Sequence, residues 1–84
     1  MKVKSNHVYV LIKLFTPAKT FFKMLNIIEN EPYIKTIATL NKKWDYLIEI
    51  EHEDIETVNN AVIRIINNGD VVSYQILNVD QTKK

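Results

Sequence analysis

Hydrophobic residues recur at two different periods along the chain, and the order of these periods constrains the fold more than any other feature. In four segments every second residue is apolar, as at Val8, Val10, Ile12 and Leu14, which places side chains on one face of a strand. In two intervening segments the period is 3.6, which is typical of an amphipathic helix. The predicted strands cover 7–15, 33–40, 44–51 and 71–79, and the predicted helices cover 17–30 and 54–68.

Polar residues, proline and glycine support these boundaries. Thr16-Pro17 favours a helix start, because the hydroxyl can cap free N–H groups and proline suits the first helical position. Asn68-Gly69 favours the end of the second helix. The polar turn 41–43 joins the second and third strands into a hairpin.

The order of elements predicts an α+β fold, a ferredoxin-like βαββαβ sandwich. Strand-helix-strand occurs twice, and right-handed crossovers then put both helices on one face of a four-stranded antiparallel sheet. A chain of 84 residues with 46% hydrophobic content can build one core, so residues 1–84 are predicted to form a single domain. Because such a small domain buries a modest share of its surface, association with copies of itself is an expected source of stability.

Charge and composition exclude several classes of protein. Eleven basic and ten acidic residues leave a net charge of +1, which gives no bulk attraction to nucleic acid or to an anionic membrane. No apolar run approaches the roughly 20 residues of a membrane-spanning helix. Without cysteine the chain can form neither disulfides nor thiolate metal sites, and a cytoplasmic location is expected.

Residues suited to catalysis are few. His7 and His52 lie on different predicted elements without a second ligand at metal-binding spacing, so no metal site is predicted. Gly69 is the only glycine, which excludes a glycine-rich phosphate loop. The acidic residues around Glu49 and Glu51 are typical of a solvated strand end beside a helix start. The chain is therefore predicted not to be an enzyme and to need no cofactor.

The predicted sheet is apolar on both faces. One face of the first strand carries Tyr9 and Leu11, and the other carries the series that begins at Val8. Only one of these faces can meet the helices, so the face that stays open is apolar in either case. The alternation predicts one face for Ile34, Thr36, Ala38 and Leu40 of the second strand. In the fourth strand it predicts one face for Val72, Tyr74 and Ile76 and the opposite face for Val71, Leu77 and Val79.

An exposed apolar patch of more than a few hundred Å² usually marks an interface. We therefore predict a homodimer that forms through the open sheet face. The predicted interface residues are Tyr9, Leu11, Leu47 and Leu77. The alternative is that the strand registers are shifted by one and that these are the scattered surface hydrophobes of an ordinary monomer.

The motifs "VYVLIKL", "WDYLIEIE" and "EDIETVNNAV", in this order, resemble a known family over nearly the whole chain. The most specific parts are Trp44-Asp45-Tyr46-Leu47 after the hairpin turn and the acidic pair Glu53-Asp54. They are similar to the effector-binding domain (RAM, ACT-like) of the Lrp/AsnC transcription regulators. With the first strand so close to Met1, the chain is similar to a stand-alone version that lacks the helix-turn-helix domain.

The resemblance implies a homodimer, often a larger ring of dimers, with an amino acid or related molecule bound near the hairpin turn. The implied ligand-contacting residues are Asn41, Lys42, Lys43 and Asp45, with Asp54 as an addition. A lysine can bind the ligand carboxylate and an aspartate its ammonium. The family turn typically has glycine where Lys42 stands, and lysine here either replaces a backbone contact with a charge or fills the pocket and abolishes binding. The alternative is a solvated turn in which Asp45 stabilises the loop.

The resemblance also implies partners and leaves one other class of function open. Full-length Lrp/AsnC-type regulators are possible partners through mixed oligomers, and direct contact with nucleic acid or membrane is not expected. The second hypothesis is a small dimeric α/β-barrel enzyme, similar to cofactor-free monooxygenases, for which Trp44 is the supporting residue. A buried polar pocket inside each protomer would favour this enzyme, and a pocket at 41–45 between dimers would favour the sensing module.

Overall fold

The computed structural model describes residues 5–17, 19, 26, 31–40 and 43–79. Its strands are β1 (Asn6–Leu14), β2 (Ile34–Thr39), β3 (Tyr46–His52) and β4 (Val71–Asn78), and its helix α2 covers Ile55–Ile66. These elements begin and end within two residues of the predicted positions. Of the predicted helix over 17–30, Pro17, Lys19 and Asn26 are described and are helical, and the rest lies outside the described residues.

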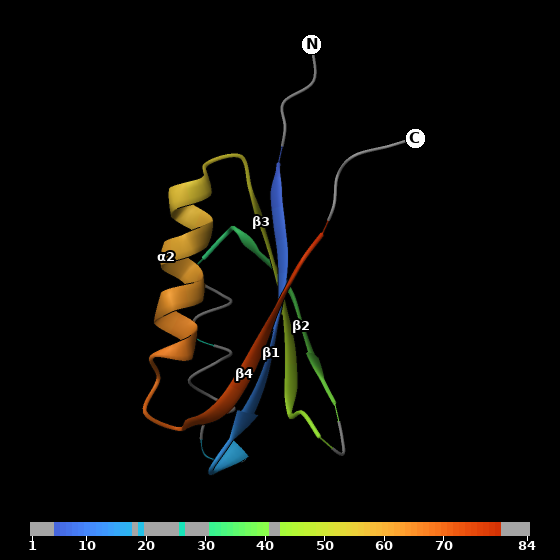
Figure 1. The fold of residues 1–84 in the computed structure, drawn as a ribbon, viewed down its shortest axis with the longest axis vertical. Helices are drawn as coiled ribbons and strands as arrows, with labels where there is room; N and C mark the ends of the chain where they lie inside the picture. The colour runs from blue at the N-terminus through green and yellow to red at the C-terminus, as the bar shows by residue number, and fades with distance from the viewer. Residues whose placement is uncertain (1–4, 18, 20–25, 27–30, 41–42, 80–84) are drawn as a thin grey trace.

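The four strands form one antiparallel sheet in the order β2-β3-β1-β4. This order places β1 and β3 in the centre, and α2 lies against one side of the sheet (Figure 1). The arrangement confirms the predicted ferredoxin-like α+β fold. None of the helical residues that the structure describes belongs to a helix long and apolar enough to cross a bilayer.

The core lies between the sheet and α2. The period-two residues of β1 all point toward the helix, and Val10 and Ile12 are completely buried. Ile48 and Ile50 of β3 are equally buried beside them. The helix contributes Val58, Ala61, Val62 and Ile65. Full burial of one such aliphatic side chain contributes roughly 1.5–3 kcal/mol, so this layer is a major part of the driving force for folding.

Local hydrogen bonds fix both ends of α2. Asp54 is the N-cap: its carboxylate accepts from the Glu56 main-chain N–H at 3.3 Å and from the Thr57 hydroxyl at 2.9 Å. These bonds hold the pKa of Asp54 below its usual value, and the bond from Thr57 has the largest effect. At the C-terminal end the Asn67 N–H donates to the Ile63 carbonyl at 2.9 Å. The predicted start of α2 therefore has a capping residue, and the helix ends with Asn67 as its C-cap, one residue before the predicted Asn68-Gly69.

A bulge in β2 corrects one sequence prediction. Ile34 pairs with Ile50, but Thr36 pairs with Glu49, so Lys35 is an extra residue in this strand. Ile34 therefore lies on the core side, whereas Thr36 and its neighbour Ala38 lie on the opposite side. The predicted common face for these residues was wrong, because a bulge shifts the alternation by one residue.

A second bulge changes the start of β4. Leu14 pairs with Val71 and Lys13 pairs with Ser73, which leaves Val72 as the extra residue. Val71 consequently packs against the core, and Val72 is 59% exposed. The prediction that Val71 shares a face with Leu77 was wrong for the same physical reason as in β2.

Candidate functional site

The side of the sheet away from α2 gathers the four predicted interface residues. We call this side the open face. Across the β1–β3 pair Leu11 lies opposite Leu47, and across the β1–β4 pair Tyr9 lies opposite Leu77. Opposite residues in antiparallel strands share a face and have neighbouring side chains. The full set is His7, Tyr9, Leu11, Lys13, Thr36, Ala38, Leu47, Glu49, Glu51, Ser73, Gln75 and Leu77.

The apolar centre of the open face is only partly covered. Tyr9, Leu11 and Leu47 are half-buried by their neighbours in the sheet, and Leu77 is 42% exposed. In Figure 1, α2 is on the opposite side of the sheet. Among the described residues these side chains therefore form an apolar surface that nothing from α2 protects from water.

A polar cluster occupies one end of the open face. His7 Nε2 lies 2.7 Å from Glu49 Oε2, and the Tyr9 hydroxyl donates to the same oxygen at 3.3 Å. Hydrogen bonds from the Thr36 and His7 side chains lower the pKa of Glu49. Partial burial, and then the charge of Glu49, raise the pKa of Tyr9. At neutral pH the cluster thus combines an ionised carboxylate with a neutral phenol.

The sequence pattern predicts no metal site at His7 and a solvated strand end around Glu49, so it does not predict this cluster. The available signal was the common two-residue spacing of His7 with Tyr9 and of Glu49 with Glu51. Only the pairing of β1 with β3 places His7 opposite Glu51 and Tyr9 opposite Glu49. Strand register is a long-range property, which local periodicity does not specify.

The predicted ligand site at the hairpin turn is partly described. Asn41 and Lys42 lie outside the described residues. Lys43 is exposed, and its Nζ lies 5.6 Å from the centroid of the Trp44 ring. This is a cation–π distance, so the indole helps to position the ammonium group. A positive charge is therefore available at the surface of the turn.

Asp45 ties this turn to the centre of the sheet. Its Oδ2 accepts from the Leu14 main-chain N–H at 2.7 Å, and its own N–H donates to the Ile12 carbonyl at 2.8 Å. Its carbonyl accepts from the Leu40 N–H at 2.8 Å. These bonds give Asp45 the loop-stabilising role that sequence reasoning offered as the alternative to ligand binding.

Asp54, the fifth predicted ligand residue, lies at the other end of β3. Seven residues of β3 separate the two ends, which corresponds to at least about 20 Å at the usual strand rise. Within one protomer Asp54 therefore cannot contact a ligand that is bound at Lys43 and Asp45. Its carboxylate instead caps α2.

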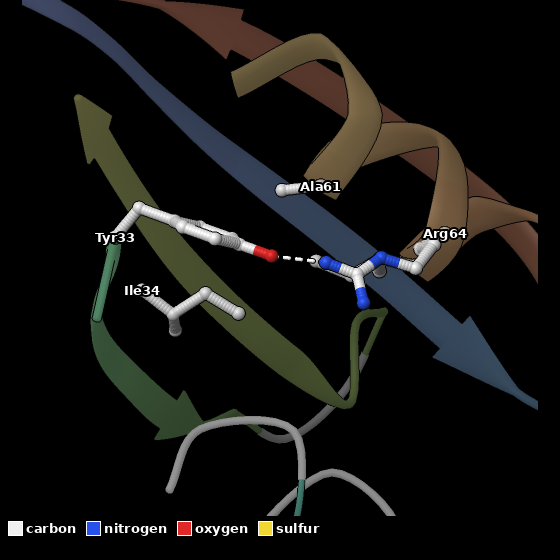
Figure 2. A pocket seen from close by; sticks show the side chains of 5 residues that line it. Tyr33, Ile34, Ala61 and Arg64 are labelled. Carbon is white, nitrogen blue, oxygen red and sulfur yellow. Dashed lines mark hydrogen bonds between the residues drawn. The ribbon is translucent and has the colours of Figure 1, made fainter. Parts of the chain in front are cut away.

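A small cavity lies between the start of β2 and α2 (Figure 2). It is lined by Tyr33, Ile34, Ala61, Arg64 and Ile65. The Arg64 guanidinium donates to the Tyr33 hydroxyl and to the Glu31 carboxylate. The volume is about 20 Å³, which is the size of one water molecule, whereas small-molecule sites usually have about 300 Å³ or more. This cavity cannot accommodate an amino acid.

The described side chains provide no obvious metal centre. Within 5–17, 31–40, 43–79 and the two single helical positions, no three histidine, aspartate or glutamate side chains come close enough to hold an ion. In the polar cluster of the open face, the described histidine and carboxylate in direct contact are His7 and Glu49, which are two groups rather than three.

Neither a protein-family model nor a curated protein matches the sequence. Solved structures do match the fold. E. coli AsnC has a TM-score of 0.71 at 17% identity, with coverage of 92% of this chain and 52% of that chain. An AsnC family transcriptional regulator from Agrobacterium tumefaciens has 0.69 at 16%, with coverage of 98% and 54%. A transcriptional regulator from Neisseria meningitidis, solved as a complex with L-Met, has 0.73 at 14%, with coverage of 94% and 52%.

These structural neighbours are transcriptional regulators rather than enzymes. The chain spans about half the length of each, and the low identities limit the likeness to the fold. The resemblance that the sequence motifs suggested is therefore matched by the three-dimensional structure. The chain has the fold of a region that makes up about half of AsnC-family transcriptional regulators.

Proposed function

We propose that the chain is an assembly and sensing module related to transcription regulators: it self-associates through the open face and binds a small ligand of the amino-acid class. The observation that carries this proposal is the fold that it shares with AsnC-family regulators, one of which was solved with L-Met. In this proposal the module acts through its partners, including full-length regulators of the same type.

The surface chemistry of the open face supports self-association. Tyr9, Leu11, Leu47 and Leu77 form a contiguous apolar centre, and polar groups occupy its ends. A standard protein interface buries about 800 Å² per partner, which is close to what one face of a four-stranded sheet can supply. Two open faces packed together remove this apolar surface from water, which is the main driving force of association.

Charges at the hairpin turn support a ligand that carries both a carboxylate and an ammonium group. Lys43 is an exposed cation beside Trp44, and Lys42 adjoins it in the sequence. Asn41 supplies a neutral polar side chain. Asp45 can receive the ammonium group through the carboxylate oxygen that is not bonded to Leu14. Asp54 takes part only if it comes from a neighbouring copy in a ring of dimers.

Light scattering coupled to size-exclusion chromatography tests self-association. The wild-type chain should be a dimer at micromolar concentration, and Leu47→Glu should be a monomer, since it buries an unpaired charge in the interface. Ile63→Glu is the matched control, because Ile63 is 49% exposed on α2, away from the open face. A monomeric wild-type protein, or a Leu47→Glu protein that stays dimeric, would contradict the proposal.

Thermal unfolding with each of the twenty amino acids tests the ligand. A ligand at 100 times its dissociation constant stabilises the folded protein by about 2.7 kcal/mol, which raises the midpoint by several degrees. Lys43→Ala should abolish the shift, and Lys35→Ala, an exposed lysine of β2, should retain it. If no amino acid shifts the wild-type midpoint but one shifts that of Lys42→Gly, the lysine has closed the site. No shift in either protein would contradict ligand sensing.

A further inference from the structure

We propose that self-association through the open face is coupled to the uptake of a proton by His7, so that the dimer strengthens as the pH falls from about 8.5 to 5.5. The inference rests on the proposed self-association and adds its regulation. The contact that carries it is the 2.7 Å pair between His7 Nε2 and Glu49 Oε2, which lies on the surface that would be covered.

The pair is already partly withdrawn from water. The side chain of His7 is 15% exposed and that of Glu49 is 22% exposed. A second open face placed over them would remove the remaining contact with water. Burying an ionised carboxylate is costly unless a positive charge accompanies it, because the low dielectric of an interface penalises a lone charge.

His7 is the group that can supply this positive charge. From β3 it is faced by Glu49 and Glu51, and from its own strand by Tyr9. From β4 the contact is neutral, because the Val79 main-chain N–H donates to the His7 carbonyl. The described cation of the open face, Lys13, is six residues away along β1, or roughly 20 Å.

The other groups of the cluster do not titrate between pH 5.5 and 8.5. Glu49 stays ionised, because the hydrogen bonds from Thr36 and His7 hold its pKa below the ordinary value of 4.5. Tyr9 stays neutral, because partial burial and the charge of Glu49 raise its pKa above 10.0. An imidazole is the side chain whose ordinary titration falls in this window.

The sign of the effect follows from charge balance. With His7 protonated, a neutral ion pair is covered on association. With His7 neutral, each protomer must bury a net negative charge at Glu49, with Glu51 nearby. Association is then stronger in the protonated form, and it weakens as the pH rises. Because both protomers take up a proton, the dissociation constant should rise by about tenfold or more from pH 5.5 to 8.5.

Sedimentation equilibrium at pH 5.5, 7.0 and 8.5, at constant ionic strength, measures this change. The wild-type dissociation constant should rise with pH. His7→Gln should be insensitive to pH and weak throughout, since Glu49 keeps an uncompensated charge. Glu49→Gln should lose the strengthening at low pH and should bind more tightly than the wild type at pH 8.5, since a neutral imidazole then has no carboxylate beside it to be buried. These opposite expectations separate charge compensation from a mere loss of folding, which circular dichroism also checks.

The only other histidine in the chain provides the matched control. His52 Nδ1 accepts from the Asp54 N–H at 2.9 Å, beside the start of α2 and off the open face. His52→Gln should keep the full pH dependence of the wild-type dimer. A dimer of constant strength from pH 5.5 to 8.5, or a pH dependence that survives in His7→Gln, would overturn this inference and leave the proposed self-association intact. A wild-type monomer at all three pH values would overturn both.

Discussion

The carboxylate of Asp45 accepts a hydrogen bond from the main-chain N–H of Leu14 at 2.7 Å, which joins the start of β3 to the end of β1. Asp45→Ala should leave this N–H without its partner and should lower the free energy of unfolding by about 1–3 kcal/mol. Urea unfolding measures the loss.

Asp45→Asn separates the structural role of Asp45 from a role in ligand binding. The amide oxygen can still accept from Leu14, so this variant should keep most of the stability that Asp45→Ala loses. It removes the negative charge, so binding of an amino-acid ammonium group should weaken. Equal losses of stability in the two variants would argue that the charge, rather than the hydrogen bond, holds the loop.

Ile48 is completely buried between the sheet and α2. Ile48→Ala should cost about 2–5 kcal/mol of unfolding free energy, because it removes buried methyl groups and leaves a cavity. Ile63→Ala, at a position that is 49% exposed, should cost much less. Similar midpoints of thermal unfolding for the two variants would contradict the described core.

Because the pKa of Glu49 is lowered in the folded protein, Glu49 should make the free energy of unfolding fall more steeply as the pH becomes acidic. A carboxylate whose pKa is lower in the folded than in the unfolded protein stabilises the fold at pH values above the pKa of the unfolded protein. This stabilisation is lost as the pH falls through the pKa of the folded protein. The contribution of Glu49 should therefore disappear below about pH 4.5. Urea midpoints of wild type and Glu49→Gln should differ more at pH 6 than at pH 3.

The bonds of Arg64 to Tyr33 and Glu31 should contribute little to stability. The Arg64 side chain is 61% exposed, and exposed ion pairs are typically worth about 1 kcal/mol or less. Arg64→Ala and Tyr33→Phe should each shift the thermal midpoint by only a few degrees. A loss as large as that of Ile48→Ala would mean that the cluster is part of the core.

Sequence reasoning succeeded where the physical signal is local. The period of two in β1 identified the strand and the residues that share each of its two faces, because every residue of this strand keeps the alternation. The acidic residue before the second apolar stripe located the start of α2, because a capping group acts on the nearest turn. The faces of Ile34 and Val71 failed, because a bulge depends on the partner strand rather than on the segment itself.

The sequence by itself determined the order of the elements, their approximate ends and the presence of apolar residues on both sides of the sheet. These properties follow from backbone periodicity and from contacts within a few residues. The tertiary structure decided which side faces α2 and brought His7, 42 residues away in sequence, to Glu49. It also gave Asp45 its bond to Leu14. Strand pairing sets these relationships, and one residue of register would move every side chain to the other face.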